Sequence, residues 1–372
     1  HHFFKDLINM IYLSCLILGV LFDLPYAQIN STNKDRHRVL NGGIIEVPVR
    51  NSSIEGSSTL KSITIFIDGQ LLHPFIDTGA GWTLIPHLES FGSEACKKWS
   101  FGCISCKTSK CTTNKPKLLH VNYGICRAEF FVYDGLLEIQ QHKIKNFRFG
   151  LMTSWKGCPA AHPPASIGLE PEWGHPGKKD HFVYQLVSAG AIDSAVASIA
   201  LTRDTKLVTF GGGFRVPQVY FTSTSQDRWQ VNMESLVVAG GGPSQASQYL
   251  FPVFPDKGPL YMDPTNGREL HQARVKSSFD QIYWYGKCKD FNLDALKDST
   301  IGFGLQTSSV PYTARVRLSK LLFIVEEYCT FDLRATAEEQ LDWDWLLGDA
   351  FFDSHYVQFF YDTKSIGLTE RL

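Results

Sequence analysis

The stretch Phe75-Ile76-Asp77-Thr78-Gly79-Ala80 decides the fold, because it places a carboxylate at the end of an apolar run. A buried lone charge is costly, so such an Asp is normally paired, hydrogen-bonded or partly protonated. Thr78 offers a hydroxyl for a buried hydrogen bond, and Gly79 lets another backbone come close. We therefore expect the rest of the chain to supply a partner for Asp77.

The composition indicates a mostly β protein with two domains. The chain has 372 residues, of which 13% are aromatic, and a formal net charge of −1. This length is too great for one small core. Short runs of Val, Ile, Phe, Tyr and Thr recur between Gly-rich turns, as is typical of strands. The near-zero charge, with no basic patch interleaved with aromatics, argues against a nucleic-acid partner.

The apolar run from Ile11 to Phe22 has the character of a signal peptide. It is too short and too interrupted for a stable membrane span, and cleavage after Ala27 fits the small-residue pattern of signal peptidase sites. The sequence thus predicts a signal peptide at 1–27, a flexible leader at 28–42, and secretion or delivery to the endolysosomal lumen. A retained anchor or a buried segment is the alternative.

Eight cysteines beyond Cys15 support an exported chain, because an even number in such a protein suggests disulfides. They are Cys96, Cys103, Cys106, Cys111, Cys126, Cys158, Cys288 and Cys329. The four between 96 and 111 allow three pairings, with zinc as a weaker alternative. Cys126 and Cys158 are either a pair or two free thiols. Asn30 and Asn51 begin glycosylation sequons, which predict a glycoprotein.

Strand and turn signals alternate along the chain. Asp68-Gly69 predicts a hairpin between strands at 63–67 and 71–76. A helical pattern begins at Phe182 and stops near Gly190. The run Gly211-Gly212-Gly213 breaks the chain, so we expect an N-terminal lobe at 43–213 and a C-terminal lobe at 214–372. Further strands are expected at 43–49, 120–123, 128–133, 147–152, 195–201, 206–210, 229–238, 321–325 and 357–360.

The second half repeats the opening pattern. An apolar run, Tyr249 to Phe254, is followed within two residues by Asp256-Lys257-Gly258. This is again an apolar lead into Asp-x-Gly, so Asp256 is the expected partner of Asp77. Asp263 lies close by and is the rival.

Taken in order, these motifs resemble a pepsin-family aspartic peptidase from about Gly43 to the C-terminus. Asp77-Thr78-Gly79 resembles the first catalytic motif and Tyr123-Gly124 the tip of the flap. The other segments that resemble the family are Gly168-Leu169, Trp229-Gln230-Val231, the block from Trp345 to Phe352, and Tyr361-Asp362 to Gly367-Leu368.

The resemblance implies an all-β, bilobal fold of two barrel-like lobes with a cleft between them. In it, Asp77 and Asp256 are the catalytic dyad, which shares one proton and activates a water against a peptide bond. Tyr123, Gly79, Gly124 and Gly258 are implied to bind substrate, an extended peptide. A Cys288–Cys329 disulfide, a monomer and the absence of any cofactor are also implied.

The chain departs from this pattern at the second motif. Lys257 replaces a Thr that locks the two Asp loops, and an ammonium can only donate hydrogen bonds. Pro259 removes a backbone donor. Leu84 stands where an aromatic residue usually supports the flap tyrosine, and the leader before Gly43 is shorter than the family's inhibitory propeptide. An inactive homologue that binds peptide or protein ligands is therefore the alternative to an active endopeptidase.

Overall fold

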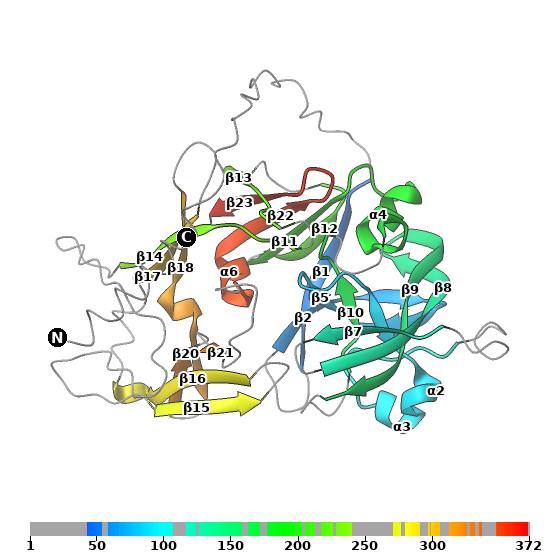
Figure 1. The fold of residues 1–372 in the computed structure, drawn as a ribbon, viewed down its shortest axis with the longest axis horizontal. Coiled ribbons are helices and arrows are strands. Elements are labelled where there is room, and N and C mark those ends of the chain that lie inside the picture. Colours follow the sequence, from blue (N-terminus) through cyan, green and yellow to red (C-terminus); the bar gives the residue numbers. More distant parts are fainter. Residues whose placement is uncertain are drawn as a thin grey trace, which may run out of the picture. The chain divides into compact units, whose positions relative to one another are not determined.

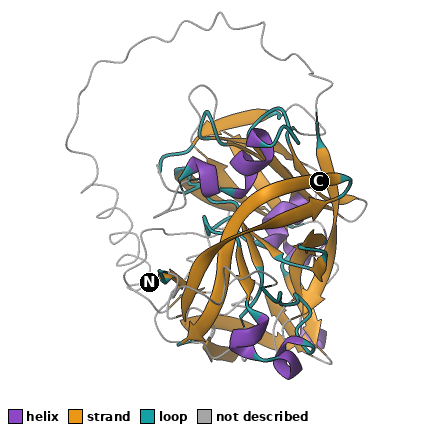
Figure 2. Cartoon of the chain, turned by 90° about the vertical axis from the view of Figure 1, so that its right-hand side faces the viewer, coloured by secondary structure: helices purple, strands orange, loops and turns teal. Residues whose placement is uncertain are grey.

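The computed structural model is built mainly of β-strands, which confirms the all-β prediction (Figures 1 and 2). No closed barrel forms among the strands that the structure describes. The described residues are 43–53, 59–106, 117–123, 126–157, 163–171, 177–202, 205–212, 217–225, 228–239, 271–276, 280–290, 297, 299–305, 312–325, 328–331, 335–336 and 347–370.

Fifteen strands form one sheet, in the order β13-β23-β22-β11-β12-β1-β2-β5-β10-β6-β9-β8-β3-β4, with β7 paired to β8. Their bounds are β1 Ile45–Ser53, β2 Thr59–Ile63, β3 Ile65–Ile67, β4 Gln70–Leu72, β5 Phe75–Asp77, β6 Leu84–Pro86, β7 Leu119–Tyr123, β8 Cys126–Ile139, β9 His142–Lys156, β10 Ser166–Gly168, β11 Val196–Thr202, β12 Thr205–Phe210, β13 Val219–Thr222, β22 His355–Phe360 and β23 Ser365–Glu370.

Two smaller sheets and several short helices complete the described structure. One sheet has the order β14-β17-β18, and the other β15-β16-β20-β19 with β21 on β16. The strands are β14 Met233–Ala239, β15 His271–Lys276, β16 Asp280–Lys287, β17 Thr300–Leu305, β18 Tyr312–Arg317, β19 Leu322–Val325, β20 Tyr328–Phe331 and β21 Ala335–Thr336. The helices are α2 Leu88–Phe91, α3 Ser93–Cys96, α4 Phe182–Ser188, α6 Asp349–Ser354 and the 3-10 turns η2 Lys178–Asp180, η3 Cys288–Asp290 and η4 Leu318–Lys320. Within the described ranges, the helices are all too short or too polar to cross a membrane.

The predicted hairpin at Asp68-Gly69 is confirmed, but the single strand expected after it is wrong. Asp68 and Gly69 both have positive φ, 50° and 72°, as a two-residue hairpin turn requires. The next strand stops at Leu72, and β5 starts only at Phe75. The break arises because the His73 N–H leaves the sheet to donate to the Phe101 carbonyl at 3.0 Å.

The long sheet joins strands from both sides of the predicted lobe boundary. β11 pairs with β22, with Val196 opposite Phe360, and β1 pairs with β12, with Ile45 opposite Phe210. All described residues lie in one compact unit of the chain. The division into lobes at Gly213 stays a prediction.

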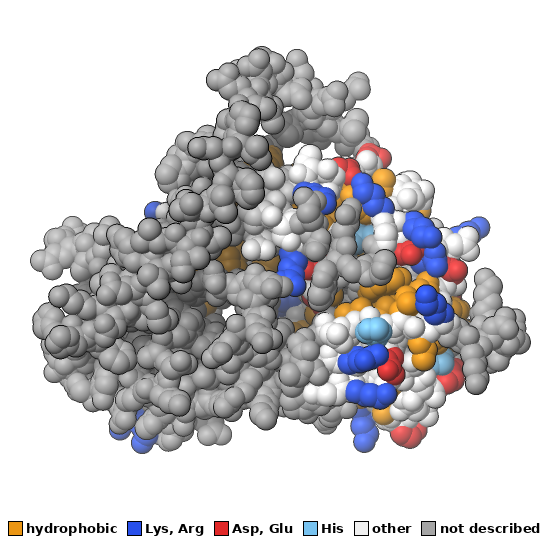
Figure 3. All heavy atoms as spheres, in the orientation of Figure 1, with side chains coloured by type: hydrophobic (Ala, Val, Ile, Leu, Met, Phe, Trp, Pro, Cys, Tyr) orange, Lys and Arg blue, Asp and Glu red, His pale blue; other side chains and the backbone are white. Residues whose placement is uncertain are grey.

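The cysteine-rich segment after β6 begins with two short helices, α2 and α3, and contains a disulfide. Cys96 and Cys103 are bonded, with an S–S distance of 2.00 Å. Cys106 is also disulfide-bonded, so the zinc alternative is wrong for these three sulfurs. On the face drawn in Figure 3, the basic and acidic side chains of the described part are intermingled.

Candidate active site

Asp77 ends strand β5, and neighbouring strands fix the backbone on both sides of its turn. β10 runs parallel to β5, with Gly168 opposite Asp77. The Leu169 N–H donates to the Asp77 carbonyl at 2.7 Å, and the Glu170 N–H donates to the Ala80 carbonyl at 3.0 Å. The four-residue turn from Asp77 to Ala80 is therefore held at its first and last carbonyl groups by consecutive amides.

Gly168, which the sequence analysis named only as part of a segment that resembles the family, is required beneath this turn. A Cβ atom there would lie 2.6 Å from the Ala80 and Trp82 oxygens and from the Gly81 carbonyl carbon. No side chain fits such a contact, because all three atoms belong to the backbone. Gly168 therefore sets the distance between the turn and β10.

Gly79 acts differently from what the sequence suggests. Within the described part of the chain, the nearest atom to a Cβ at Gly79 is Asp77 Oδ1 at 3.6 Å, which is an ordinary contact. No close backbone approach therefore explains this glycine there. Its amide matters instead, because the Gly79 N–H donates to Asp77 Oδ1 at 3.0 Å.

The Asp77 carboxyl group is set up to hold a proton near neutral pH. Burial raises its pKa to about 6, and the hydrogen bond from Gly79 opposes the rise. By accessible surface the residue is only half-buried. The raised pKa and the partial exposure together indicate a recessed carboxyl, with protein around it and water on one side. A carboxyl of this kind can exchange protons with a bound reactant.

The β7–β8 hairpin occupies the place expected for the flap. Tyr123 pairs with Cys126 across the hairpin, and Gly124 and Ile125, which lie between them, are outside the described residues. Tyr123 is described through its backbone only. Cys126 is buried and disulfide-bonded, so the free-thiol alternative is wrong for this residue.

Trp82 is a residue of this region that the sequence analysis missed. Its ring lies 5.1 Å from that of Phe130 on β8 and is 4% exposed. Leu84, Ala128 and Met152 share the same apolar cluster, against which Val121 of β7 also packs. The hairpin base therefore rests on an aromatic residue two positions before Leu84. The sequence signal that could have predicted this contact is a large aromatic residue, Trp82, five positions after Asp77.

The sequence model of the family described as eukaryotic aspartyl protease matches residues 60–371. The chain belongs to this family. No curated protein matches the sequence. The match covers Asp77, the hairpin and the strands to the end of β23. The match places the chain in a hydrolase family, the pepsin-like aspartyl proteases, whose substrates are peptides.

Several predicted features of the chain fall on residues outside the described ranges. They are Asp256, Lys257, Gly258, Pro259, the rival Asp263, and the predicted signal peptide and leader. The Cys288–Cys329 disulfide is confirmed, at the point where η3 follows β16 and Cys329 lies in β20. The dyad stays a prediction from the sequence.

Two aromatic side chains donate hydrogen bonds to Leu169, whose own N–H holds the Asp77 turn. The Trp229 indole N–H donates to the Leu169 carbonyl at 2.7 Å, and the Tyr361 hydroxyl donates to the same oxygen at 2.8 Å. The sequence analysis noted both residues only as points of family resemblance. The hydrogen bonds have no local signature, since they link residues far apart in the chain.

Proposed function

We propose that the protein is an aspartic endopeptidase in which Asp77 and Asp256 share one proton. The observation that carries the proposal is the recessed Asp77 carboxyl, whose pKa burial raises to about 6. A carboxyl that holds a proton near neutral pH suits a dyad in which one member is ionised and the other is neutral.

In this proposal the ionised carboxylate of the dyad takes a proton from a bound water, and the neutral carboxyl protonates the scissile carbonyl oxygen. The attack needs no covalent enzyme intermediate. Gly79 and Gly258 lie beside the two carboxyls, and Tyr123 and Gly124 cover an extended peptide. The fixed turn between Asp77 and Ala80 supports this role, because catalytic groups must be held in one geometry.

The test separates Asp256 from its rival. The chain is expressed through the secretory pathway of a eukaryotic cell and assayed on denatured globin from pH 3 to 7, with and without a statine inhibitor. We expect inhibitor-sensitive cleavage that Asp256→Asn abolishes and the matched variant Asp263→Asn leaves within about twofold. Loss with Asp263→Asn and retention with Asp256→Asn would assign the dyad to the rival.

An inactive peptide-binding homologue is the second candidate, favoured by Lys257 and Pro259 in the second motif. A positive charge beside the dyad favours two ionised carboxylates and opposes sharing of one proton. In that case the statine inhibitor binds the wild-type chain, but globin stays intact. Cleavage gained by a Lys257→Thr, Pro259→Thr double variant would then identify the second motif as the cause.

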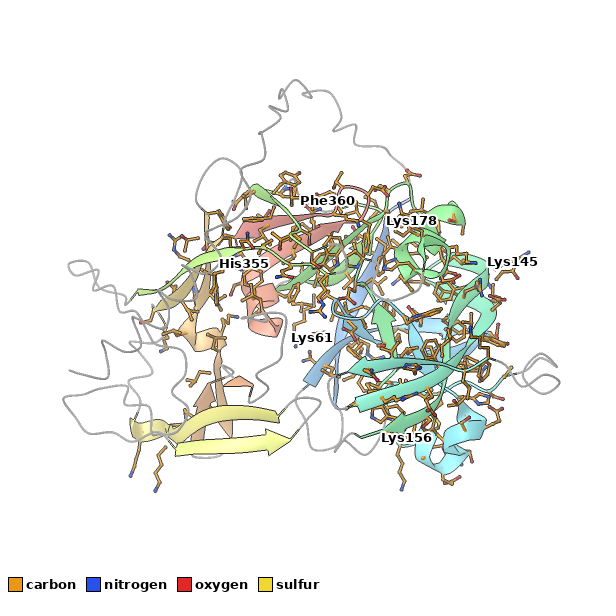
Figure 4. The ribbon with its side chains drawn as sticks, in the orientation of Figure 1. Lys61, Lys145, Lys156, Lys178, His355 and Phe360 are labelled. Atoms are coloured by element: carbon orange, nitrogen blue, oxygen red, sulfur yellow. A yellow bond between two sulfur atoms is a disulfide. The ribbon has the colours of Figure 1, made fainter. Side chains whose placement is uncertain are left out.

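The proposal includes a secreted or endolysosomal monomer, a signal peptide at 1–27 and a glycan on Asn51. Disulfides support passage through an oxidising compartment. Asn51 is exposed on β1, where its side chain accepts a hydrogen bond from Lys61 at 3.1 Å (Figure 4 labels Lys61 on β2). Glycosidase treatment of the secreted chain should convert Asn51 to Asp and lower its mass, whereas Asn51→Gln should lack that glycan. An N-terminal sequence that still begins before residue 28 would contradict cleavage after Ala27.

A further inference from the structure

We propose that Trp229 and Tyr361 are positioning residues for the Asp77 turn and act through the carbonyl group of Leu169. The inference rests on the proposed function, because it concerns how the catalytic carboxyl is held. It adds two residues whose side-chain hydrogen bonds go to Leu169 rather than to Asp77.

The Leu169 oxygen is fully used by side-chain donors. It accepts the Trp229 indole N–H at 2.7 Å and the Tyr361 hydroxyl at 2.8 Å. A carbonyl oxygen has two lone pairs, so these two donors satisfy it. The donors lie 60 and 192 residues along the chain from Leu169. Neither bond is part of a helix or a sheet ladder.

The same peptide group then holds the catalytic turn. The Leu169 carbonyl and the Glu170 N–H belong to one peptide unit, and that N–H donates to the Ala80 carbonyl at 3.0 Å. Hydrogen bonds in such a chain polarise one another, so donors on the Leu169 oxygen strengthen the bond that Glu170 makes. The Leu169 N–H meanwhile donates to the Asp77 carbonyl at 2.7 Å. Fixing the Leu169 oxygen therefore fixes both ends of the turn.

The Tyr361 hydroxyl has little freedom to turn elsewhere. The residue is 2% exposed, and its ring lies 4.9 Å from that of His181 and 5.1 Å from that of Trp229. Its own N–H donates to the Ala195 carbonyl at 3.0 Å. The phenol is thus clamped by backbone and rings, and its hydroxyl bond is a rigid support rather than an incidental contact.

The matching experiment removes the two donors. Tyr361→Phe deletes the hydroxyl and keeps the ring. Trp229→Phe deletes the indole N–H together with the five-membered ring that carries it, and the double variant combines both changes. The control is Tyr133→Phe, because Tyr133 is also buried (4% exposed) and its hydroxyl donates to Asp68 Oδ2 at 3.0 Å, outside the Asp77 turn. Each variant is characterised by kcat, KM and thermal midpoint, and by titration of the 13C-labelled Asp77 carboxyl in NMR spectra.

We expect Tyr361→Phe to lower kcat by about fivefold and the double variant by more than tenfold, with KM within twofold. The Asp77 carboxyl should titrate at higher pH, because a looser turn weakens the hydrogen bond from the Gly79 N–H. Tyr133→Phe should lower the thermal midpoint alone. A purely structural role predicts that Tyr361→Phe behaves as this control does, and that result would overturn the inference.

The carboxyl titration keeps this inference separate from the proposed function. If the wild-type chain cleaves no peptide, the endopeptidase proposal fails, but the NMR titration still reports on the turn. A shift of the Asp77 titration in Tyr361→Phe would then support the positioning role in an inactive protein. An unchanged titration in both the single and double variants would refute it.

Discussion

The Asp77 turn and the start of helix α4 each bury one titratable side chain, yet burial moves the two pKa values in opposite directions. Burial raises the pKa of Asp77 to about 6 and lowers that of His181 to about 4. The cause is the same in both cases, because a poorly hydrated site disfavours the charged form. Between about pH 4 and pH 6 the fold therefore holds both groups neutral.

The two sites differ in how completely their polar atoms are satisfied. His181 is 1% exposed; its Nδ1 accepts the Val183 N–H at 3.3 Å, and its Nε2–H donates to the Glu170 carbonyl at 2.9 Å. A second proton has no place, since Nδ1 already faces a donor. Asp77 is half-buried and keeps contact with water. His181 is therefore a structural group, whereas the partly exposed Asp77 is the one of the two that can exchange a proton with a reactant.

Asp77→Asn should produce the largest effect, a loss of about 10²–10⁴-fold in kcat, because an amide cannot transfer the proton. Its effect on stability has the opposite sign. The raised pKa means that Asp77 contributes stability below its ordinary value of 3.8, which is lost as the pH rises through 6. At pH 7.5, Asn should therefore raise the free energy of unfolding by about 1–2 kcal/mol, after discounting a full shift worth about 3 kcal/mol for partial exposure.

Globin cleavage and urea unfolding at pH 7.5 and pH 4 measure these two effects. The stability gain should vanish at pH 4, where Asp77 is protonated in the native chain. Asp68→Asn is the control, since this carboxylate accepts hydrogen bonds from Leu136 N–H and the Tyr133 hydroxyl and should lose stability at both pH values. A destabilised Asp77→Asn at pH 7.5 would contradict the burial argument.

His181→Asn tests the other site through the pH dependence of stability. The pKa of His181 falls from its ordinary value of 6.5 to about 4, so its contribution is complete above 6.5 and is lost as the pH falls through 4. Over that range the shift is worth about 3 kcal/mol. Asn can still cap the Val183 N–H. We therefore expect the variant to lose about 2–3 kcal/mol less than wild type between pH 7.5 and pH 4.

Urea unfolding at both pH values gives the slope, which separates titration from the packing lost with the ring. His120→Asn is the control for the substitution itself, because His120 is exposed on β7. Acid sensitivity should also persist in His181→Asn, since burial lowers the pKa of His355 to about 4 as well. The His355 ring stacks on that of Phe351 in α6, with ring centroids 4.3 Å apart; His355 is labelled in Figure 4. A His181→Asn slope as steep as that of wild type would show that His181 does not titrate as described.

The sequence could predict the Asp77 side of the site because its signals are local. The Asp-Thr-Gly turn and the hairpin at Asp68-Gly69 each follow from a few consecutive residues, whereas Gly168-Leu169 was noted only through the family resemblance. The strand that was expected to continue to Ile76 breaks because His73 bonds to Phe101, a partner that local pattern does not reveal.

Contacts between distant parts of the chain explain the roles that the sequence analysis missed. Trp229 and Tyr361 donate to the backbone oxygen of Leu169. Because every residue has such an oxygen, the residue type at position 169 does not predict the contact. Trp82 packs against Phe130 through ring shape and distance, which a linear pattern does not encode. The Cys288–Cys329 pair, by contrast, was expected from the family resemblance, and the structure confirms it.

Two glycines, Gly79 in the Asp77 turn and Gly168 beneath it in β10, give the smallest and most specific test. At Gly168, Ala would bring Cβ to 2.6 Å from backbone atoms of Ala80, Gly81 and Trp82, whereas at Gly79 the nearest described atom is 3.6 Å away. Overpacking of this kind costs about 1–3 kcal/mol. We therefore expect Gly168→Ala to lower the free energy of unfolding by that amount and to lower kcat, because the turn must move away from β10.

Gly79→Ala is the matched control. It adds the same methyl group, but within the turn itself, and it keeps the amide that donates to Asp77. Its free energy of unfolding should stay within about 0.5 kcal/mol of wild type, as for substitutions without a steric or polar defect. Urea unfolding and kcat of the two variants, measured side by side, check the prediction. Equal losses of unfolding free energy at both positions would mean that the contact with β10 does not set the position of the turn. Gly168 would then not contribute to the difference between the Asp77 and His181 sites.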